Sequence, residues 1–101
     1  MKELIERVAK EANWTFDTGC LCWLPRKGSV MFYADEDALL DAGVVALLRE
    51  LLDAGWELRK EWEEPLAPFM VERLEQPAGF ADGGTLEEAL CLAFLVHRGA
   101  S

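Results

Sequence analysis

The strongest constraint on the fold of this chain is a nearly all-apolar helix predicted for residues 85–98. Thr85 is a typical N-cap, Glu88 stands where a capping box places its acidic residue, and Gly99 suits the position that ends a helix. Between these ends the segment is apolar except in its first turn. A helix with so little polar surface packs against a sheet or between other elements. The sequence therefore predicts a layered domain organised around this helix.

The preceding residues predict two more helices and two pairs of strands. Hydrophobic periodicity and turn residues give a helix over 2–12, strands over 20–24 and 29–34, a helix over 35–54, and strands over 56–62 and 69–75. Trp14 to Asp17 also has strand propensity, with a turn at Thr18-Gly19. The order α-β-β-α-β-β-α predicts a single α+β sandwich domain over 1–101. Its sheet is expected to be four-stranded, mainly antiparallel and packed with helices.

Several boundaries follow from particular residues. Asn13 is expected to end the first helix, and the acidic residues Asp35, Glu36 and Asp37 are expected to form the first turn of the second. That helix should end at Gly55, while Gly43 inside it indicates close packing against a neighbour.

The strand over 56–62 has the alternation of a half-buried strand. Trp56, Leu58 and Trp62 should share its buried side. Residues 63–68 contain two prolines and predict a linker, and residues 77–84 predict a loop into the terminal helix.

The charge of the chain narrows the classes of partner. The formal net charge is −9, and the sequence contains no cluster of Lys and Arg. Nucleic-acid backbones and anionic membrane surfaces are disfavoured, because their binding depends on such clusters. The acidity fits a solubility device, attraction to a basic partner, or mimicry of nucleic acid.

Other features predict a cytoplasmic protein. Residues 1–12 alternate charged with apolar residues and do not resemble a secretory signal, and no run reaches the length of a membrane span. Three cysteines, an odd number, do not form a disulfide framework, which favours a reducing compartment.

The terminal segment resembles a known family. The run Glu88-Ala-Leu-Cys-Leu-Ala-Phe-Leu95, preceded by the threonine cap, is similar to the last helix of the phage ABA-sandwich domain proteins. Leu92 stands where a basic residue is common in that family, and Phe94 where alanine is common. The resemblance implies a helix–sheet–helix sandwich of phage or prophage origin in a bacterial host. It implies no chemistry, cofactor or catalytic residue.

The sequence gives little indication of a catalytic or metal-binding site. Cys20, Cys22, Cys91 and His97 form a zinc set on paper, and Cys20 or Cys22 with His97 a nucleophile pair. However, Cys91 and His97 diverge by about 120° around one helix, so burial of the thiols and capping by His97 are the favoured interpretations. The paired carboxylates at Glu63-Glu64 and Glu87-Glu88 fall in a linker and a helix start. No metal, cofactor or enzymatic activity is predicted.

The favoured function is therefore binding. We expect a small acidic accessory protein that docks a host or phage protein with a basic surface, for example by inhibiting a defence or nucleic-acid enzyme. The alternatives are a homo-oligomeric structural or virion component and a small-ligand-binding protein with a tryptophan-lined pocket. An exposed tryptophan beside carboxylates is typical of a protein-binding hot spot. The candidate partner surface comprises Trp23, Glu61, Glu63 and Glu64.

Overall fold

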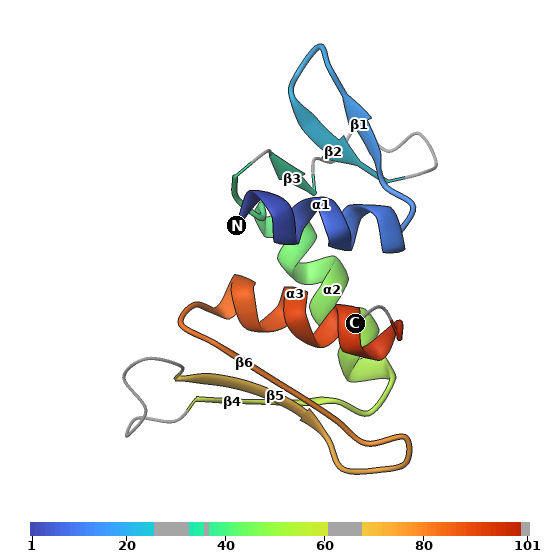
Figure 1. Cartoon of the computed structure of the whole chain (residues 1–101), viewed down its shortest axis with the longest axis vertical. Helices are drawn as coiled ribbons and strands as arrows, with labels where there is room; N and C mark the ends of the chain where they lie inside the picture. Colours follow the sequence, from blue (N-terminus) through green and yellow to red (C-terminus); the bar gives the residue numbers. More distant parts are fainter. Residues whose placement is uncertain (26–32, 36, 61–67, 100–101) are drawn as a thin grey trace.

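The chain folds into three helices and two small antiparallel sheets (Figure 1). The computed structural model describes residues 1–25, 33–35, 37–60 and 68–99. Its elements, in chain order, are α1 (Lys2–Glu11), β1 (Thr15–Asp17), β2 (Cys22–Leu24), β3 (Ala34–Asp35), α2 (Asp41–Asp53), β4 (Glu57–Lys60), β5 (Phe69–Arg73), β6 (Gly79–Gly83) and α3 (Leu86–His97). The predicted α+β class is confirmed, but the single four-stranded sheet is wrong: the six described strands form two three-stranded sheets.

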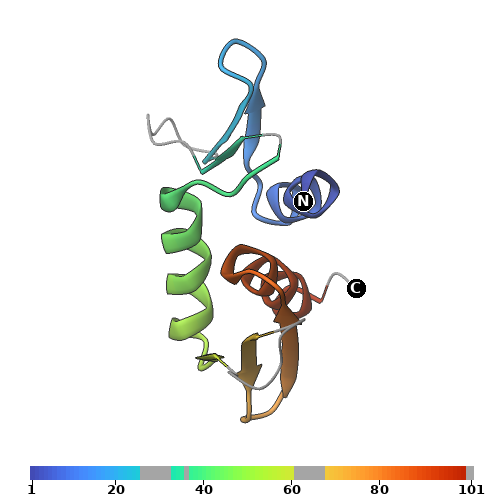
Figure 2. The same ribbon diagram turned by 90° about the vertical axis from the view of Figure 1, so that its left-hand side faces the viewer.

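Helix α3 is the centre of the core, as its composition requires. Its residues 89–91 and 93–95 are buried, and it lies between α1 and the sheet β4-β5-β6, with α2 alongside (Figure 2). The side-chain oxygen of Thr85 accepts a hydrogen bond from the Glu88 amide at 3.2 Å, and Gly99 has a φ of 75°. Both predicted ends of this helix are therefore confirmed.

The sheet below α3 contains a strand that the sequence did not predict. β5 is central, with β4 and β6 antiparallel on either side, so the predicted loop over 77–84 is wrong. Glycines explain how β6 packs so closely. A Cβ on Gly79 would lie 2.5 Å from the ring of Trp56, and one on Gly83 would lie 2.8 Å from the backbone nitrogen of Ala89.

The second sheet packs at the other end of the molecule, beside α1. Asn13, with a φ of 61°, ends α1 as predicted and turns the chain into β1. β2 is central and pairs antiparallel with β1 and β3, which confirms strand pairing across the predicted hairpin. Residues 29–32 of the predicted strand lie outside the described residues.

Helix α2 begins later than its acidic residues suggested. Asp35 belongs to β3, and its carboxylate accepts hydrogen bonds from the amides of Asp37 and Ala38 at 2.8 and 2.6 Å. The carboxylate therefore stabilises a turn before the helix instead of the first helical turn. α2 starts at Asp41 and ends before Gly55, whose φ of 93° fits the predicted helix end.

The close approach predicted at Gly43 is confirmed. The backbone carbonyl of Tyr33 lies against this glycine, where a Cβ would overlap it. The Leu40 amide donates a hydrogen bond of 3.0 Å to the same carbonyl. Gly43 thus lets α2 lie directly under the chain that enters β3.

The predicted buried side of the strand at 56–62 is correct only in part. Trp56 is buried in the core, but Leu58 is 38% exposed, because β4 is an edge strand. Trp62 and most of the predicted 63–68 linker lie outside the described residues.

Within the part of the chain that is described, no helix has the length and apolar character needed to cross a membrane.

Candidate partner-binding site

Trp23, the predicted centre of a partner surface, lies on the middle strand of the sheet beside α1. Its cross-strand neighbours are Phe16 on β1 and Ala34 on β3. Ala34 is fully buried, so this row of three residues is on the face directed toward the core. Trp23 is half-buried, and its ring meets that of Phe16 edge to face with centroids 5.0 Å apart. Packing against Phe16 therefore limits the positions that the indole can adopt.

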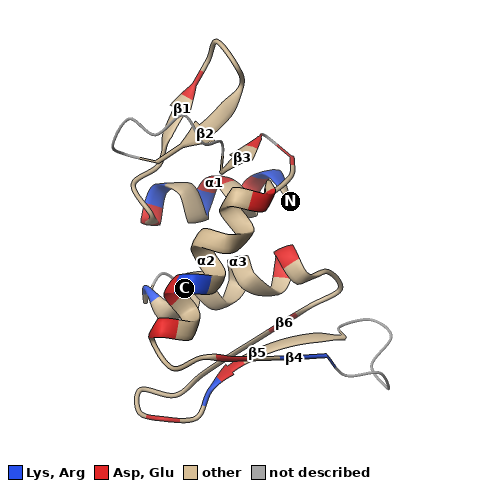
Figure 3. Cartoon of the chain, turned by 180° about the vertical axis from the view of Figure 1, so that it is seen from behind, with Lys and Arg blue, Asp and Glu red and all other residues tan. Residues whose placement is uncertain are grey.

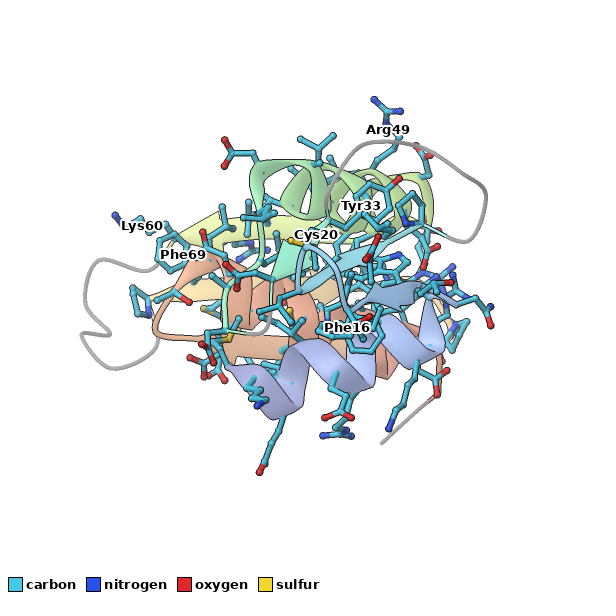
Figure 4. All side chains as sticks on the ribbon, turned by 90° about the horizontal axis from the view of Figure 1, so that it is seen from above. Phe16, Cys20, Tyr33, Arg49, Lys60 and Phe69 are labelled. Carbon is cyan, nitrogen blue, oxygen red and sulfur yellow. The ribbon has the colours of Figure 1, made fainter. Side chains whose placement is uncertain are left out.

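The two aromatic rings line a small hollow against helix α1. Lys2 and Glu6 complete its lining, and its volume is about 250 Å³. Seen from the end of the molecule that carries β1 and β2, Phe16 lies over α1 (Figure 4). Glu6 is exposed and also forms an ion pair with Lys10 at 3.4 Å. The hollow thus combines two aromatic rings with one carboxylate, that of Glu6, and one ammonium group, that of Lys2.

The other predicted members of the surface are not placed beside Trp23. Glu61, Glu63 and Glu64 lie outside the described residues. Acidic side chains are spread over the helices and both sheets of the described chain, with basic residues among them (Figure 3). In the described part of the chain the negative charge is therefore spread out, and a carboxylate of α1, Glu6, lies beside Trp23.

Sequence reasoning missed Phe16 and Glu6 as companions of Trp23. The signal for Phe16 was present in the turn at Thr18-Gly19, which returns the chain so that β1 pairs with β2. The Asp17 carboxylate accepts a hydrogen bond of 2.7 Å from the Gly19 amide, which stabilises this turn. Glu6 gave no local signal, because the packing of α1 against this sheet brings it near Trp23.

The two cysteines at the tip of the hairpin do not lie on one strand, although the sequence predicts a strand over 20–24. Leu21, between the two cysteines, has a φ of 56°, so the chain turns there and only Cys22 belongs to β2. The Cys22 thiol donates to the Cys20 carbonyl at 3.2 Å. Desolvation raises the pKa of Cys22, and the hydrogen bond with Cys20 and the negative charges of its cross-strand neighbours Asp35 and Asp17 raise it further. These surroundings favour a protonated thiol.

The zinc set and the nucleophile pair find no support among the described residues. Cys91 is buried inside the core, where desolvation raises the pKa of its thiol to about 12. His97 lies at the far end of the same helix, with its ring edge-on to Trp56 at 6.3 Å. Nowhere in the described ranges do three or more His, Cys, Asp or Glu side chains come together as a metal site would require.

His97 and Arg98 contact α2 at the end of α3. Arg98 donates two hydrogen bonds to the Glu50 carboxylate, at 2.8 and 3.0 Å, and its guanidinium lies 5.0 Å from the centre of the Phe94 ring. His97 lies 3.7 Å from the same carboxylate. The bond to Glu50 raises the pKa of Arg98 further above its usual value. This cluster joins two helices, which explains its charges without a ligand.

Burial and exposure predict different reactivities for the three thiols. At neutral pH, iodoacetamide should modify exposed Cys20 first and half-buried Cys22 more slowly, while Cys91 should remain unmodified until the chain unfolds. Mass spectrometry of quenched samples, with and without urea, measures this order. A Cys20→Ser variant is the control that should lose the fast phase. Labelling of Cys91 at the rate of Cys20 would contradict the burial described above.

Comparison with known proteins adds no relative to this description. The chain has no match to a protein-family model and no significant match to a curated protein or a solved structure.

Proposed function

We propose that this protein is a non-catalytic binding protein that docks a partner with a basic surface. The observation that carries the proposal is the hollow formed by Phe16 and Trp23, with the Glu6 carboxylate at its rim. Aromatic side chains that are held in place and only partly buried are typical anchors of protein interfaces. The diffuse negative charge of the chain would attract a basic partner over a longer range, before contact.

The size of the hollow favours a partner side chain over a free small ligand. Pockets for cofactors and drug-sized ligands span roughly 300–1,000 Å³. The volume here, about 250 Å³, lies below that range but is sufficient for one apolar or aromatic side chain. An apolar residue flanked by Lys or Arg fits the aromatic lining of the hollow and can place its neighbour beside the Glu6 carboxylate.

The biological setting is proposed on different grounds. The similarity of the terminal helix to phage ABA-sandwich proteins supports an accessory role in a phage or prophage, carried out in the bacterial cytoplasm. A non-catalytic role is supported by the described residues, among which no three His, Cys, Asp or Glu side chains converge as a metal site would require.

Peptide selection followed by charge reversal tests the proposal. Peptides selected from a random display library on the wild-type protein should be basic and share one apolar or aromatic position. Glu6→Lys should raise the dissociation constant of these peptides roughly fivefold, because it places positive charge at the rim of the hollow. Fluorescence polarisation with a labelled peptide measures the change.

Matched variants separate the site from the overall charge. Glu3→Lys makes the same charge change on the exposed face of α1 without lining the hollow, and should weaken binding by at most about twofold. Trp23→Ala should abolish binding, whereas Phe80→Ala, an exposed aromatic on the other sheet, should not. Equal losses in Glu3→Lys and Glu6→Lys, or unchanged binding in Trp23→Ala, would contradict the proposal.

A further inference from the structure

Strand β4 is an exposed edge of its sheet. It pairs with β5 on one side, and among the described residues no strand lies on its other side. All four residues, Glu57 to Lys60, are exposed. The side of an edge strand that faces away from its sheet can accept another strand. β4 lies in the sheet below α3, at the opposite end of the molecule from Trp23 (Figure 1).

The pairing register shows which side chains of β4 lie on each face. Leu58 is opposite Val71 of β5, which is opposite Ala81 of β6. Val71 and Ala81 are buried, so this row is on the core face, toward α3. Leu58 is 38% exposed because the row ends with it at the sheet edge. Glu57 and Arg59 lie on the opposite face, where Arg59 contacts the Glu72 carboxylate at 2.6 Å.

We propose that two copies of this chain associate through β4, which pairs antiparallel with β4 of a second copy about a two-fold axis at Leu58. The two sheets then join into one antiparallel sheet of six strands. Leu58 of one copy lies beside Leu58 of the other, and the buried row continues from one core to the next. This inference goes beyond the proposed partner docking and does not depend on it.

Charge complementarity selects this register. With Leu58 on the axis, Glu57 of each copy lies opposite Arg59 of the other, which gives two oppositely charged cross-strand pairs. A two-fold axis centred on Glu57, Arg59 or Lys60 would instead place that charged residue opposite its own copy. A parallel in-register arrangement also sets like charges side by side. Leu58 is therefore the favoured centre.

Charged residues on an edge strand ordinarily discourage pairing with another chain. Here Glu57 is the register partner of Glu72, and Arg59 of the same chain lies 3.9 Å from the Glu57 carboxylate and 2.6 Å from that of Glu72. A second copy would bring a second arginine to these two carboxylates, so that two arginines would face two glutamates. The edge is thus protected against general strand addition but complementary to itself.

A single charge reversal separates dimerisation from folding. Glu57→Arg exchanges the contact with Arg59 of the same chain for one with Glu72 across the strand, and it places an arginine opposite Arg59 of a second copy, which is unfavourable. Sedimentation equilibrium over a series that reaches millimolar protein should show a reversible dimer for the wild type. We expect Glu57→Arg to raise its dissociation constant at least about tenfold and to leave the melting temperature unchanged or higher.

Two further samples test the register itself. Asp82→Arg makes the same charge change on β6, at the other edge of the sheet, and should leave the dimer unchanged. Arg59→Glu should also weaken self-association, and an equimolar mixture of it with Glu57→Arg should form a heterodimer in which every facing pair is again opposite in charge. Circular dichroism confirms that each variant folds.

The outcomes decide the proposal. A wild-type chain that stays monomeric throughout the series would overturn it. So would a dimer that survives Glu57→Arg, equal weakening by Asp82→Arg, or a mixture of folded variants that does not associate. None of these results depends on whether the hollow at Trp23 binds a peptide, so failure here and failure of the proposed function are distinguishable.

Discussion

Gly43→Ala should destabilise the protein by about 3 kcal/mol or more, although the same change inside a helix normally stabilises it by roughly 1 kcal/mol. The added Cβ would overlap the backbone carbonyl of Tyr33. That carbonyl cannot move freely, because the Leu40 amide is hydrogen-bonded to it at 3.0 Å. Either α2 shifts away from the chain entering β3, or the hydrogen bond breaks.

Urea unfolding followed by circular dichroism measures this loss, and a melting temperature lower by about 12 °C or more should accompany it. Val45→Ala is the control, because Val45 lies on the same helix and is 53% exposed. Its effect should stay within about 0.5 kcal/mol. A Gly43→Ala protein as stable as the wild type would show that α2 does not lie against Tyr33.

Phe94→Ala should destabilise the protein by about 3–5 kcal/mol. The Phe94 side chain is 2% exposed and is among the largest fully buried groups of the core. The substitution removes its contacts, leaves a cavity in the centre of the molecule, and deprives the Arg98 guanidinium of the ring it lies over. The free energy of unfolding of a domain is only about 5–15 kcal/mol, so this change removes a large part of it.

Phe80→Ala provides the matched comparison for Phe94, since it deletes the same side chain from a position that is 50% exposed. Its expected effect is below about 1 kcal/mol. Denaturant unfolding of the two variants under identical conditions measures the difference. Similar losses would contradict the central position of α3 in the core.

The sequence predicted those features that depend on neighbouring residues along the chain. The N-cap of α3, the turns at Asn13 and Gly55, and the burial of the apolar helix all follow from local patterns. Each is decided by a backbone conformation or hydrogen bond within a few residues.

The features that were missed depend on contacts between distant segments. β6 has a glycine at each end and little strand propensity, and it becomes a strand because its glycines fit under Trp56 and the start of α3. The carboxylate of Asp35 could serve a helix start or a turn, and pairing of β3 with β2 selects the turn. Tertiary packing therefore decided the elements that local propensity left open.

The candidate site was also predictable only in part. Trp23 could be singled out because it is a large apolar residue just before a proline turn, and it is half-buried as a binding residue would be. Glu6 is separated from it by a helix end and a strand. Its place at the hollow depends on how α1 packs, which no pattern near Trp23 encodes.

The packing of α1 against α3 has a kinetic consequence. These helices contact each other although almost the whole chain separates them. Contacts of such high sequence separation carry a large loop-closure entropy and slow the folding of a small domain. During synthesis, the part of α1 that contacts α3 stays uncovered until α3 has left the ribosome. A nascent chain of this sequence therefore leaves that part of its first helix exposed until residues 86–97 have been made.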